Sequence, residues 1–323
     1  MRIGLIDLDS KLPNLALMKL STYHKQQGYE VALNDFTADK LYCSVVFTRS
    51  REKVEALKRQ YPHMEIGGTG WDLSTKLPLE IHNCKPDYDL YTREFIYTRI
   101  KGGIGKKENK LKKAEVIANA GIGFTSRGCI RSCGFCVVPK AEGKFQQENE
   151  IRDIINPRSD ALILLDNNLT ADPHCLDKLR EIKERGLVVD ITQGIDVRLL
   201  TLEIAKALAE VKHLRSIHYA WDLMSFERPV LEGIKILSQH VKTWKHMCFM
   251  LVGFNTSFEE DMYRFRRIRE LNVDPYVMIY NQKPDTKLRH FARWVNGRIY
   301  KVCRWEEYSP WAKEREQGQL FGV

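Results

Sequence analysis

The feature that most constrains the fold is a series of short apolar segments that recurs from residue 121 onward. Successive segments start 40, 26, 29, 30 and 29 residues apart, which leaves room for one strand and one helix each. Amphipathic stretches such as 202–211 and 258–271 fill the gaps. The pattern predicts parallel strands in a partial (β/α)6 TIM barrel, with function on the loops that follow the strands. The segments begin near Gly121, Ala161, Leu187, Ser216, His246 and Pro275.

The first 90 residues show the same alternation on a smaller scale. Strand-like segments cover 3–6, 44–47 and 64–68, and helix-like segments cover 14–27 and 49–60. This pattern predicts an α/β domain of the Rossmann or flavodoxin type. Ligands of such sheets bind at the carboxyl ends of the strands, which here means near Asp7, Thr48 and Gly67-Gly68.

Four regions therefore follow one another along the chain. Residues 1–90 form the Rossmann-like domain, 91–116 a basic linker, 117–282 the barrel and 283–323 an aromatic, basic tail. In the linker, the strand-like segment 95–100 and the glycine-rich segment 101–106 predict a hairpin. The aromatic residues of the tail suit either packing that caps the open barrel or stacking on a nucleoside or single-stranded nucleic acid. They are Phe291, Trp294, Tyr300, Trp305, Tyr308 and Trp311.

The net charge of +9 is localised. Segment 98–115 carries +5 and segment 283–323 carries +4, so the rest of the chain is neutral. A localised basic surface attracts polyanions such as tRNA, although a solvated linker and tail would have the same composition. No apolar run approaches the roughly 20 residues that span a bilayer, and no signal-peptide cleavage site follows the N-terminus. We therefore expect a cytoplasmic protein with no membrane partner.

Three of the eight cysteines lie within eight residues of one another, in the loop after the first barrel strand. Cys129, Cys133 and Cys136 have the spacing C-x3-C-x2-C. Three thiolates on one loop can bind three irons of a [4Fe–4S] cluster, which leaves the fourth iron without a protein ligand. Structural zinc needs four ligands, and the nearest later candidates, His174 and Cys175, lie beyond the second strand. The five scattered cysteines are typical of small buried hydrophobes.

This motif, its place after the first strand of a six-unit βα series, and Phe135 just before the third cysteine resemble the radical S-adenosylmethionine (SAM) superfamily. The resemblance covers about residues 121–281. It implies that the fourth iron binds the methionine part of SAM, and that reduction yields a 5′-deoxyadenosyl radical that abstracts hydrogen from a substrate inside the barrel. It also implies an electron donor such as flavodoxin or ferredoxin.

The resemblance further implies that SAM contacts lie at the ends of the next strands. Polar residues after the second strand are expected near the methionine amine, those after the third near the ribose and carboxylate, and Gly253 near the adenine. Each is also an ordinary turn or cap residue. The expected cofactor-contacting residues are Phe135, Asn167, Asn168, Gln193, Asp196, Arg198 and Gly253.

A Rossmann-like domain before such a barrel resembles two subfamilies. Cobalamin-dependent members carry D-x-H-x-x-G, which is absent here, yet segment 67–70 resembles the glycine turn beneath the cobalamin tail. We therefore expect the fold with cobalamin absent or bound without a histidine ligand. Methylthiotransferases need three N-terminal cysteines, and this domain has only Cys43 and Cys84. Methylthiolation is therefore disfavoured.

The expected function is radical methylation or rearrangement of a small metabolite or nucleoside. Radical modification of tRNA or another nucleic acid is the first alternative, because of the basic segments. A non-catalytic iron–sulfur sensor that binds nucleic acid is the second. It would need a fourth cluster ligand, for which Cys175 is the nearest candidate.

Overall fold

The computed structural model describes residues 1–100, 107–280 and 285–308. The chain divides into two compact units, each described here by itself. The first comprises Met1–Arg131, Val137–Asp166 and Glu184–Asp190, and the second Ser132–Cys136, Asn167–Lys183 and the chain from Ile191. Among the described residues, no helix combines the length and apolar character that crossing a membrane requires.

The N-terminal sheet is parallel, with strand order β2-β1-β3-β4. Its strands are β1 (Arg2–Asp7), β2 (Glu30–Leu33), β3 (Lys40–Ser44) and β4 (Glu65–Gly67). The predicted Rossmann-like alternation is confirmed, with two differences. The strand expected at 44–47 lies earlier, as β3, and the partly exposed β2 was not predicted.

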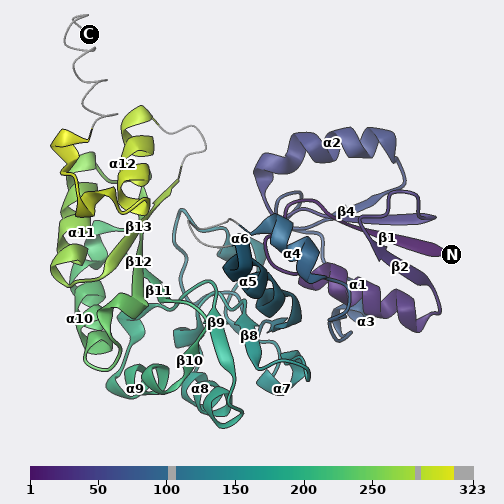
Figure 1. Cartoon of the computed structure of the whole chain (residues 1–323), viewed down its shortest axis with the longest axis horizontal. Coiled ribbons are helices and arrows are strands. Elements are labelled where there is room, and N and C mark those ends of the chain that lie inside the picture. Colours follow the sequence, from purple (N-terminus) through teal and green to yellow (C-terminus); the bar gives the residue numbers. More distant parts are fainter. Residues whose placement is uncertain (101–106, 281–284, 309–323) are drawn as a thin grey trace, which may run out of the picture. The chain divides into compact units, whose positions relative to one another are not determined.

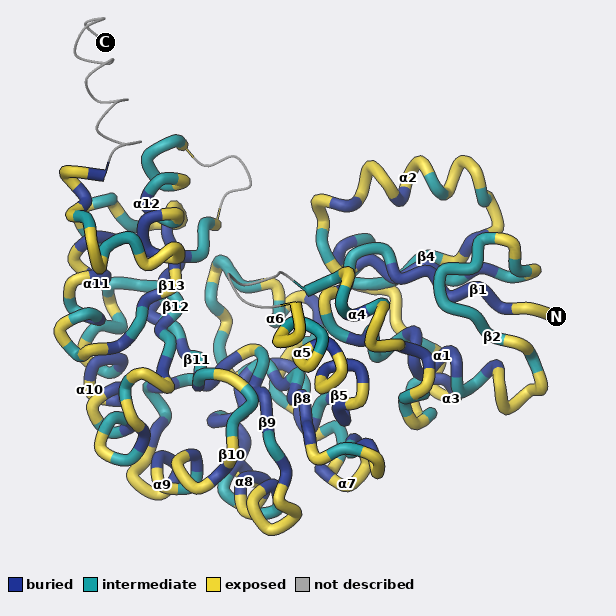
Figure 2. The backbone as a smooth tube through the Cα atoms, viewed as in Figure 1, coloured by how far each residue is buried: buried dark blue, intermediate teal, exposed yellow. Residues whose placement is uncertain are grey.

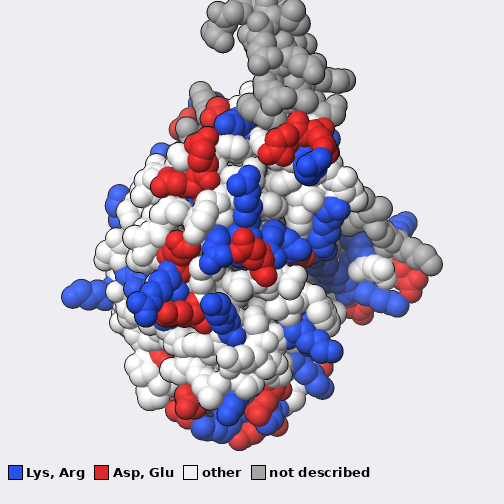
Figure 3. All heavy atoms as spheres, turned by 90° about the vertical axis from the view of Figure 1, so that its left-hand side faces the viewer, with Lys and Arg blue, Asp and Glu red and all other residues white. Residues whose placement is uncertain are grey.

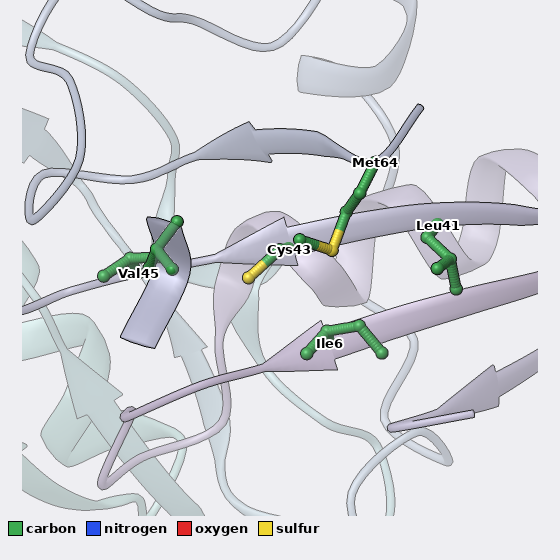
Figure 4. Packing of buried hydrophobic residues seen from close by; sticks show 6 residues of the cluster. Ile6, Leu41, Cys43, Val45 and Met64 are labelled. Carbon is green, nitrogen blue, oxygen red and sulfur yellow. The ribbon is translucent and has the colours of Figure 1, made fainter. Parts of the chain in front are cut away.

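Helices cover both faces of this sheet, with α1 (Leu15–Gln26) on one face and α2 (Arg51–Gln60) on the other (Figure 1). Asn14 caps α1, because its side chain accepts a hydrogen bond from the Leu17 N–H. Val54 of α2 is fully buried in an apolar cluster with the sheet (Figure 4). Burial raises the pKa of Cys43 in this cluster to about 12, so its thiol serves as a packed hydrophobe. The other members are Ile6, Leu41, Val45 and Met64.

The predicted hairpin is wrong where the structure describes it. Residues Arg93–Arg99 form helix α4, and Lys107–Asn119 form α5. The aromatic and β-branched residues of 95–100 favoured a strand, but the Thr92 side chain caps the helix and Ile96 is completely buried. Local propensity therefore yields to capping and packing. The glycine-rich segment 101–106 lies outside the described residues.

The first unit continues into the start of the βα series. Strand β5 (Gly121–Gly123) pairs in parallel with β8 (Ala161–Leu164), and β9 (Val188–Ile191) is the next neighbour of β8. All positions of β5 and β8 are buried (Figure 2). After β5 the chain forms a two-stranded antiparallel ladder of β6 (Ser126–Arg127) and β7 (Gln146–Gln147). The short helices here and beside the N-terminal sheet are α3 (Leu79–His82), α6 (Val138–Ala141) and α7 (Ile151–Ile154).

The second unit holds a parallel sheet in chain order, β11-β12-β13. These strands are Ile217–Ala220, His246–Val252 and Asp274–Ile279. All six strand-like segments of the series are therefore strands, as predicted, and their closure into one barrel stays a prediction. The remaining elements of this series are α8 (Cys175–Glu184), α9 (Leu202–Glu210), β10 (Lys212–His213), α10 (Glu227–Ser238), α11 (Phe258–Glu270) and α12 (Thr286–Asn296).

The aromatic residues of the tail pack within the second unit. The Trp305 ring lies 5.4 Å from the Phe258 ring, and the Trp294 ring lies 4.9 Å from the Phe265 ring of α11. These contacts favour the packing interpretation over base stacking, because a buried ring offers no free face. Trp311 and the rest of the chain after residue 308 lie outside the described residues. The buried tail aromatics are Phe291, Trp294, Trp305 and Tyr308.

Candidate functional site

The cysteine motif lies on the segment between β6 and β7, and the chain enters this segment through Gly128. Gly128 has φ +72°, and a Cβ there would lie 2.1 Å from the Lys144 carbonyl oxygen, so only glycine fits. Its N–H donates to Glu142 Oε2 at 3.0 Å, and Arg127 pairs with the same carboxylate at 3.3 Å. Backbone and side-chain contacts therefore fix the entry to the segment.

An aspartate just after β8 also fixes the residues that lead into the cysteine segment. Asp166 is completely buried and accepts four hydrogen bonds, from the N–H and hydroxyl of Thr125 and from the N–H and hydroxyl of Ser126. The four distances lie between 2.6 and 3.0 Å. The sequence analysis treated Asp166 only as one of the polar residues that follow the second strand. Its position 40 residues from Ser126 gave no local signal of this role.

The three cysteines are partly buried, and none of the chain's eight cysteines, all of which are described, forms a disulfide. The Arg131 N–H donates to Cys129 Sγ at 3.4 Å, and the Cys136 N–H donates to the Cys133 carbonyl at 2.9 Å. Cys129 belongs to the first unit, and Cys133 and Cys136 belong to the second. Within the described chain, no group of three Cys, His, Asp or Glu side chains already has metal-binding geometry.

The chemistry of this donor set fits an iron–sulfur cluster. Thiolates are the usual ligands of such clusters, and N–H donors to the sulfur tune them, as the Arg131 N–H does for Cys129. By contrast, the scattered thiols of Cys43, Cys175 and Cys248 are each no more than 3% exposed. The other two scattered cysteines, Cys84 and Cys303, are partly buried like the motif cysteines, so the expectation of buried hydrophobes is wrong for them. The spacing, and not the exposure, distinguishes the motif.

Two expected SAM neighbours lie close together in the second unit. The Phe135 ring contacts the Phe254 ring edge-to-face, with centroids 5.5 Å apart. Phe254 follows Gly253, which has φ +75° at the end of β12. The structure therefore joins Phe135 to the loop expected near the adenine.

Hydrogen bonds also connect the loops that follow β8 and β9. The Thr170 hydroxyl donates to Asn168 Oδ1 at 3.1 Å and accepts from the Asp196 N–H at 2.9 Å. Arg198 binds Asp196 through two hydrogen bonds, of 2.6 and 2.9 Å. Arg198 would therefore have to exchange this partner to bind a ligand carboxylate. Gln193 is exposed and Asn167 is partly buried.

One further acid, Asp222, is partly buried and lies outside the expected set of cofactor-contacting residues. Burial raises the pKa of Asp222, which follows β11, to about 6. Its one described hydrogen bond comes from the Leu251 N–H at 3.1 Å. Tyr219 and Trp221, beside it in sequence, are at most 1% exposed and belong to the core.

An arginine and an unpartnered hydroxyl lie in the same unit as Asp222. The completely buried Arg264 donates to the backbone carbonyls of Trp221 and Leu251 and pairs with Asp261. After β9, the buried hydroxyl oxygen of Thr192 has no hydrogen-bond partner within the described chain. Strand ends in this unit therefore carry polar groups that are not fully used by the fold.

The carboxyl edge of the N-terminal sheet is occupied by the chain's own groups. Asp7 accepts from the Tyr91 hydroxyl at 2.7 Å and from the Ser10 N–H at 2.9 Å. Arg99 of α4 donates to the carbonyls of Asp7 and Leu8 at 2.7 and 2.9 Å. Helix α4 thus supplies the cation that covers the end of β1.

The glycine turn at this edge is explained by the same close packing. A Cβ at Gly68, which has φ +102°, would lie 2.3 Å from the Val45 carbonyl oxygen. A Cβ at Gly70 would lie 2.6 Å from the Phe47 backbone. The turn therefore packs closely on the chain's own backbone, which accounts for these glycines without a ligand.

No protein-family model and no curated protein matches the sequence. Among solved structures, the chain is similar to Streptococcus suis SuiB bound to its precursor peptide SuiA, with a TM-score of 0.40 and 15% identity over 81% of this chain and 63% of SuiB. It is also similar to SuiB bound to S-adenosylmethionine, with a TM-score of 0.39 and 16% identity over 64% and 56% of the two chains. The chain thus spans less than two thirds of SuiB. TM-scores at this level do not establish a shared fold, so the chemistry of this chain rests on its own residues.

Proposed function

We propose that the chain is a radical SAM enzyme in which Cys129, Cys133 and Cys136 hold a [4Fe–4S] cluster. The observation that carries the proposal is the C-x3-C-x2-C segment between β6 and β7, directly after the first of six strands in a βα series. Residues 117–282 would form the partial barrel. When bound, the cluster would supply the electron that cleaves SAM to methionine and a 5′-deoxyadenosyl radical.

The chain's own residues would hold the ligands in place and exclude water. Gly128, Glu142 and Asp166 fix the entry to the cysteine segment, and the three thiols would come together when the cluster binds. The Phe135–Phe254 pair provides an apolar wall. The bidentate Arg198–Asp196 pair fixes the loop after β9, where ribose contacts are expected. The proposed SAM-contacting residues are Phe135, Asn167, Asn168, Gln193, Asp196, Arg198 and Gly253.

The proposed reaction is hydrogen abstraction from a small metabolite or nucleoside, leading to methylation or rearrangement. Asp222 suits a site of this kind, because a partly buried acid with a pKa of about 6 can hold or release a proton near neutral pH. Flavodoxin or ferredoxin is the proposed electron donor. No step is assigned to cobalamin, because the D-x-H-x-x-G segment is absent and packing accounts for the glycine turn.

The experiment is anaerobic reconstitution with iron and sulfide, followed by SAM and dithionite. Wild-type protein should bind iron and release 5′-deoxyadenosine, measured by mass spectrometry. Cys133→Ala should lose both. Cys303→Ala is the matched control, because Cys303 is also partly buried but lies outside the motif, and it should behave as wild type. Equal iron content in Cys133→Ala and wild type would refute the proposed ligand set.

A groove in the second unit favours nucleic-acid modification as a second candidate. The groove has a volume of about 710 Å³, and four basic side chains line it: Arg266, Arg269, Lys301 and Arg304. Three of them already pair with Asp274 or Glu307. Basic and acidic side chains are also interspersed on the face that Figure 3 shows. This candidate requires tRNA binding that weakens steeply with salt, and salt-independent binding would count against it.

The sensor alternative has less support. It needs a fourth protein ligand to the cluster, and Cys175 is only 2% exposed at the start of α8. A cluster with four protein ligands would not bind SAM. SAM binding to the reconstituted protein, measured by equilibrium dialysis, therefore separates the sensor from the enzyme.

A further inference from the structure

A cavity of about 190 Å³ lies within the first unit. Helix α1 contributes Leu15 and Lys19, α3 contributes His82, and β5 contributes Ile122. Glu148, just after β7, completes the polar side. Because an apolar cavity of about 150 Å³ holds a benzene molecule, this one has room for an organic molecule of several heavy atoms.

One wall of the cavity is apolar. Leu15, Ile122 and Ile154 line it, and the last two are at most 3% exposed. A purely polar ligand such as inorganic phosphate would leave this wall without contacts. The wall therefore favours a ligand with an aliphatic part.

The other wall carries a buried ammonium group. Lys19 is 8% exposed, and burial lowers its pKa. An ammonium has three N–H donors, and in the described chain its one hydrogen bond goes to the His82 carbonyl. A lysine this deeply buried is uncommon unless it is paired with an acceptor.

The only carboxylate near Lys19 on this wall, in the part of the chain described, is shared with two other basic groups. Glu148 pairs with His82 Nε2 at 3.2 Å and with Arg127 Nε at 3.5 Å. Arg127 also pairs with Glu142 Oε1 at 3.3 Å, so two carboxylates serve the basic groups on this side. The other acid lining the cavity, Asp153, is exposed and accepts from the Glu150 N–H at the start of α7. In the described chain no carboxylate accepts a hydrogen bond from the Lys19 ammonium, which therefore keeps N–H groups without an acceptor at the buried end of the cavity.

We propose that this cavity binds a small aliphatic carboxylate, with the ligand carboxylate on Lys19 and the aliphatic part against Leu15, Ile122 and Ile154. The ligand supplies acceptors for the Lys19 N–H groups that the described chain leaves without one, and it contacts the apolar wall. The site lies wholly in the first unit and uses none of the motif cysteines, so its existence does not depend on the proposed radical chemistry.

The test measures binding of 4-methylpentanoate to the full chain by isothermal titration calorimetry, with 4-methylpentanamide as the neutral probe of the same shape. We expect the carboxylate to bind about ten-fold or more tightly than the amide, because a charge-assisted hydrogen bond is lost with the amide. Equal binding of the two probes, or binding of neither, would overturn the proposal.

Variants locate the site. Lys19→Met should weaken carboxylate binding about ten-fold, while Lys25→Met, on the same helix but paired with Asp87 at the surface, should leave it unchanged. Leu15→Trp fills the cavity without touching the charged wall and should abolish binding. It serves as the second test if Lys19→Met does not fold. Unchanged binding in folded Leu15→Trp would place the ligand elsewhere.

Discussion

Each unit has an aspartate at the carboxyl end of a strand, Asp7 buried and Asp222 partly buried, and the two differ in how many hydrogen bonds the chain donates to them. Asp7, which ends β1, accepts from a tyrosine hydroxyl and a backbone N–H. Asp222, after β11, has one described hydrogen bond and a pKa raised to about 6. At the first edge two groups of the chain donate hydrogen bonds to the aspartate, whereas Asp222 at the second edge can still accept further hydrogen bonds. Two parallel sheets can therefore differ in whether the carboxyl ends of their strands still carry polar groups that could bind a ligand.

The largest expected effect comes from Asp166, which is used even more completely than Asp7. Asp166→Ala leaves four donors without their acceptor in a buried site and should lower the free energy of unfolding by about 3–5 kcal/mol. Urea unfolding followed by circular dichroism measures this change. The exposed Asp160, just before β8, is the matched control, and Asp160→Ala should cost less than about 0.5 kcal/mol. Equal costs for the two variants would mean that the four hydrogen bonds contribute nothing net.

The next effect tests whether the N-terminal edge is closed by the chain itself. Gly68→Ala combines a left-handed backbone with a Cβ 2.3 Å from a carbonyl oxygen, and we expect a loss of about 3 kcal/mol in unfolding free energy. Gly28 also has a positive φ, but nothing lies within 4 Å of its Cβ, so Gly28→Ala should lose only about 1 kcal/mol. If Gly68→Ala is as mild as Gly28→Ala, the turn has room for a ligand and the comparison of the two edges fails.

The smallest effect depends on pH and concerns Asp222. The folded-state pKa of about 6 exceeds the unfolded value near 4, so the native state binds the proton more tightly and wild-type stability falls as pH rises from about 4 to 6. Asp222→Asn keeps an acceptor for the Leu251 N–H and removes the titration. The variant should be more stable than wild type by roughly 2–3 kcal/mol at pH 8 and about equal near pH 4. A stability difference between Asp222→Asn and wild type that does not change with pH would show that burial does not raise the pKa of Asp222.

Strand positions were predictable because periodicity and apolar runs are local signals. The segment expected at 64–68 is β4, and the one beginning at His246 is β12. Helix α4 was missed because its cap and the burial of Ile96 outweigh the strand propensity of its residues. The spacing of the cysteines was likewise visible in the sequence.

The contacts that support the candidate site were not predicted, whether they join distant segments or near neighbours in the chain. Asp166 accepts a hydrogen bond from Thr125, 41 positions earlier in the sequence, and no pattern in either segment predicts this contact. Arg198 was expected to bind a ligand carboxylate, and in the structure it binds Asp196 two residues away. Sequence identifies which groups can bind, whereas the folded chain determines which groups already have partners.

The β6–β7 ladder has a consequence for how metal would be acquired. The ladder pins both ends of the cysteine segment, and the Cys129 N–H donates to the Gly143 carbonyl at 3.4 Å inside it. The conformational entropy of closing this loop is therefore lost when the chain folds, before any iron arrives. In a zinc finger, part of the free energy of metal binding is used to fold the chain, whereas in this chain that part remains available for metal affinity. The metal-free chain therefore already holds the cysteine segment between two paired strands, and only the thiols still have to come together on the metal.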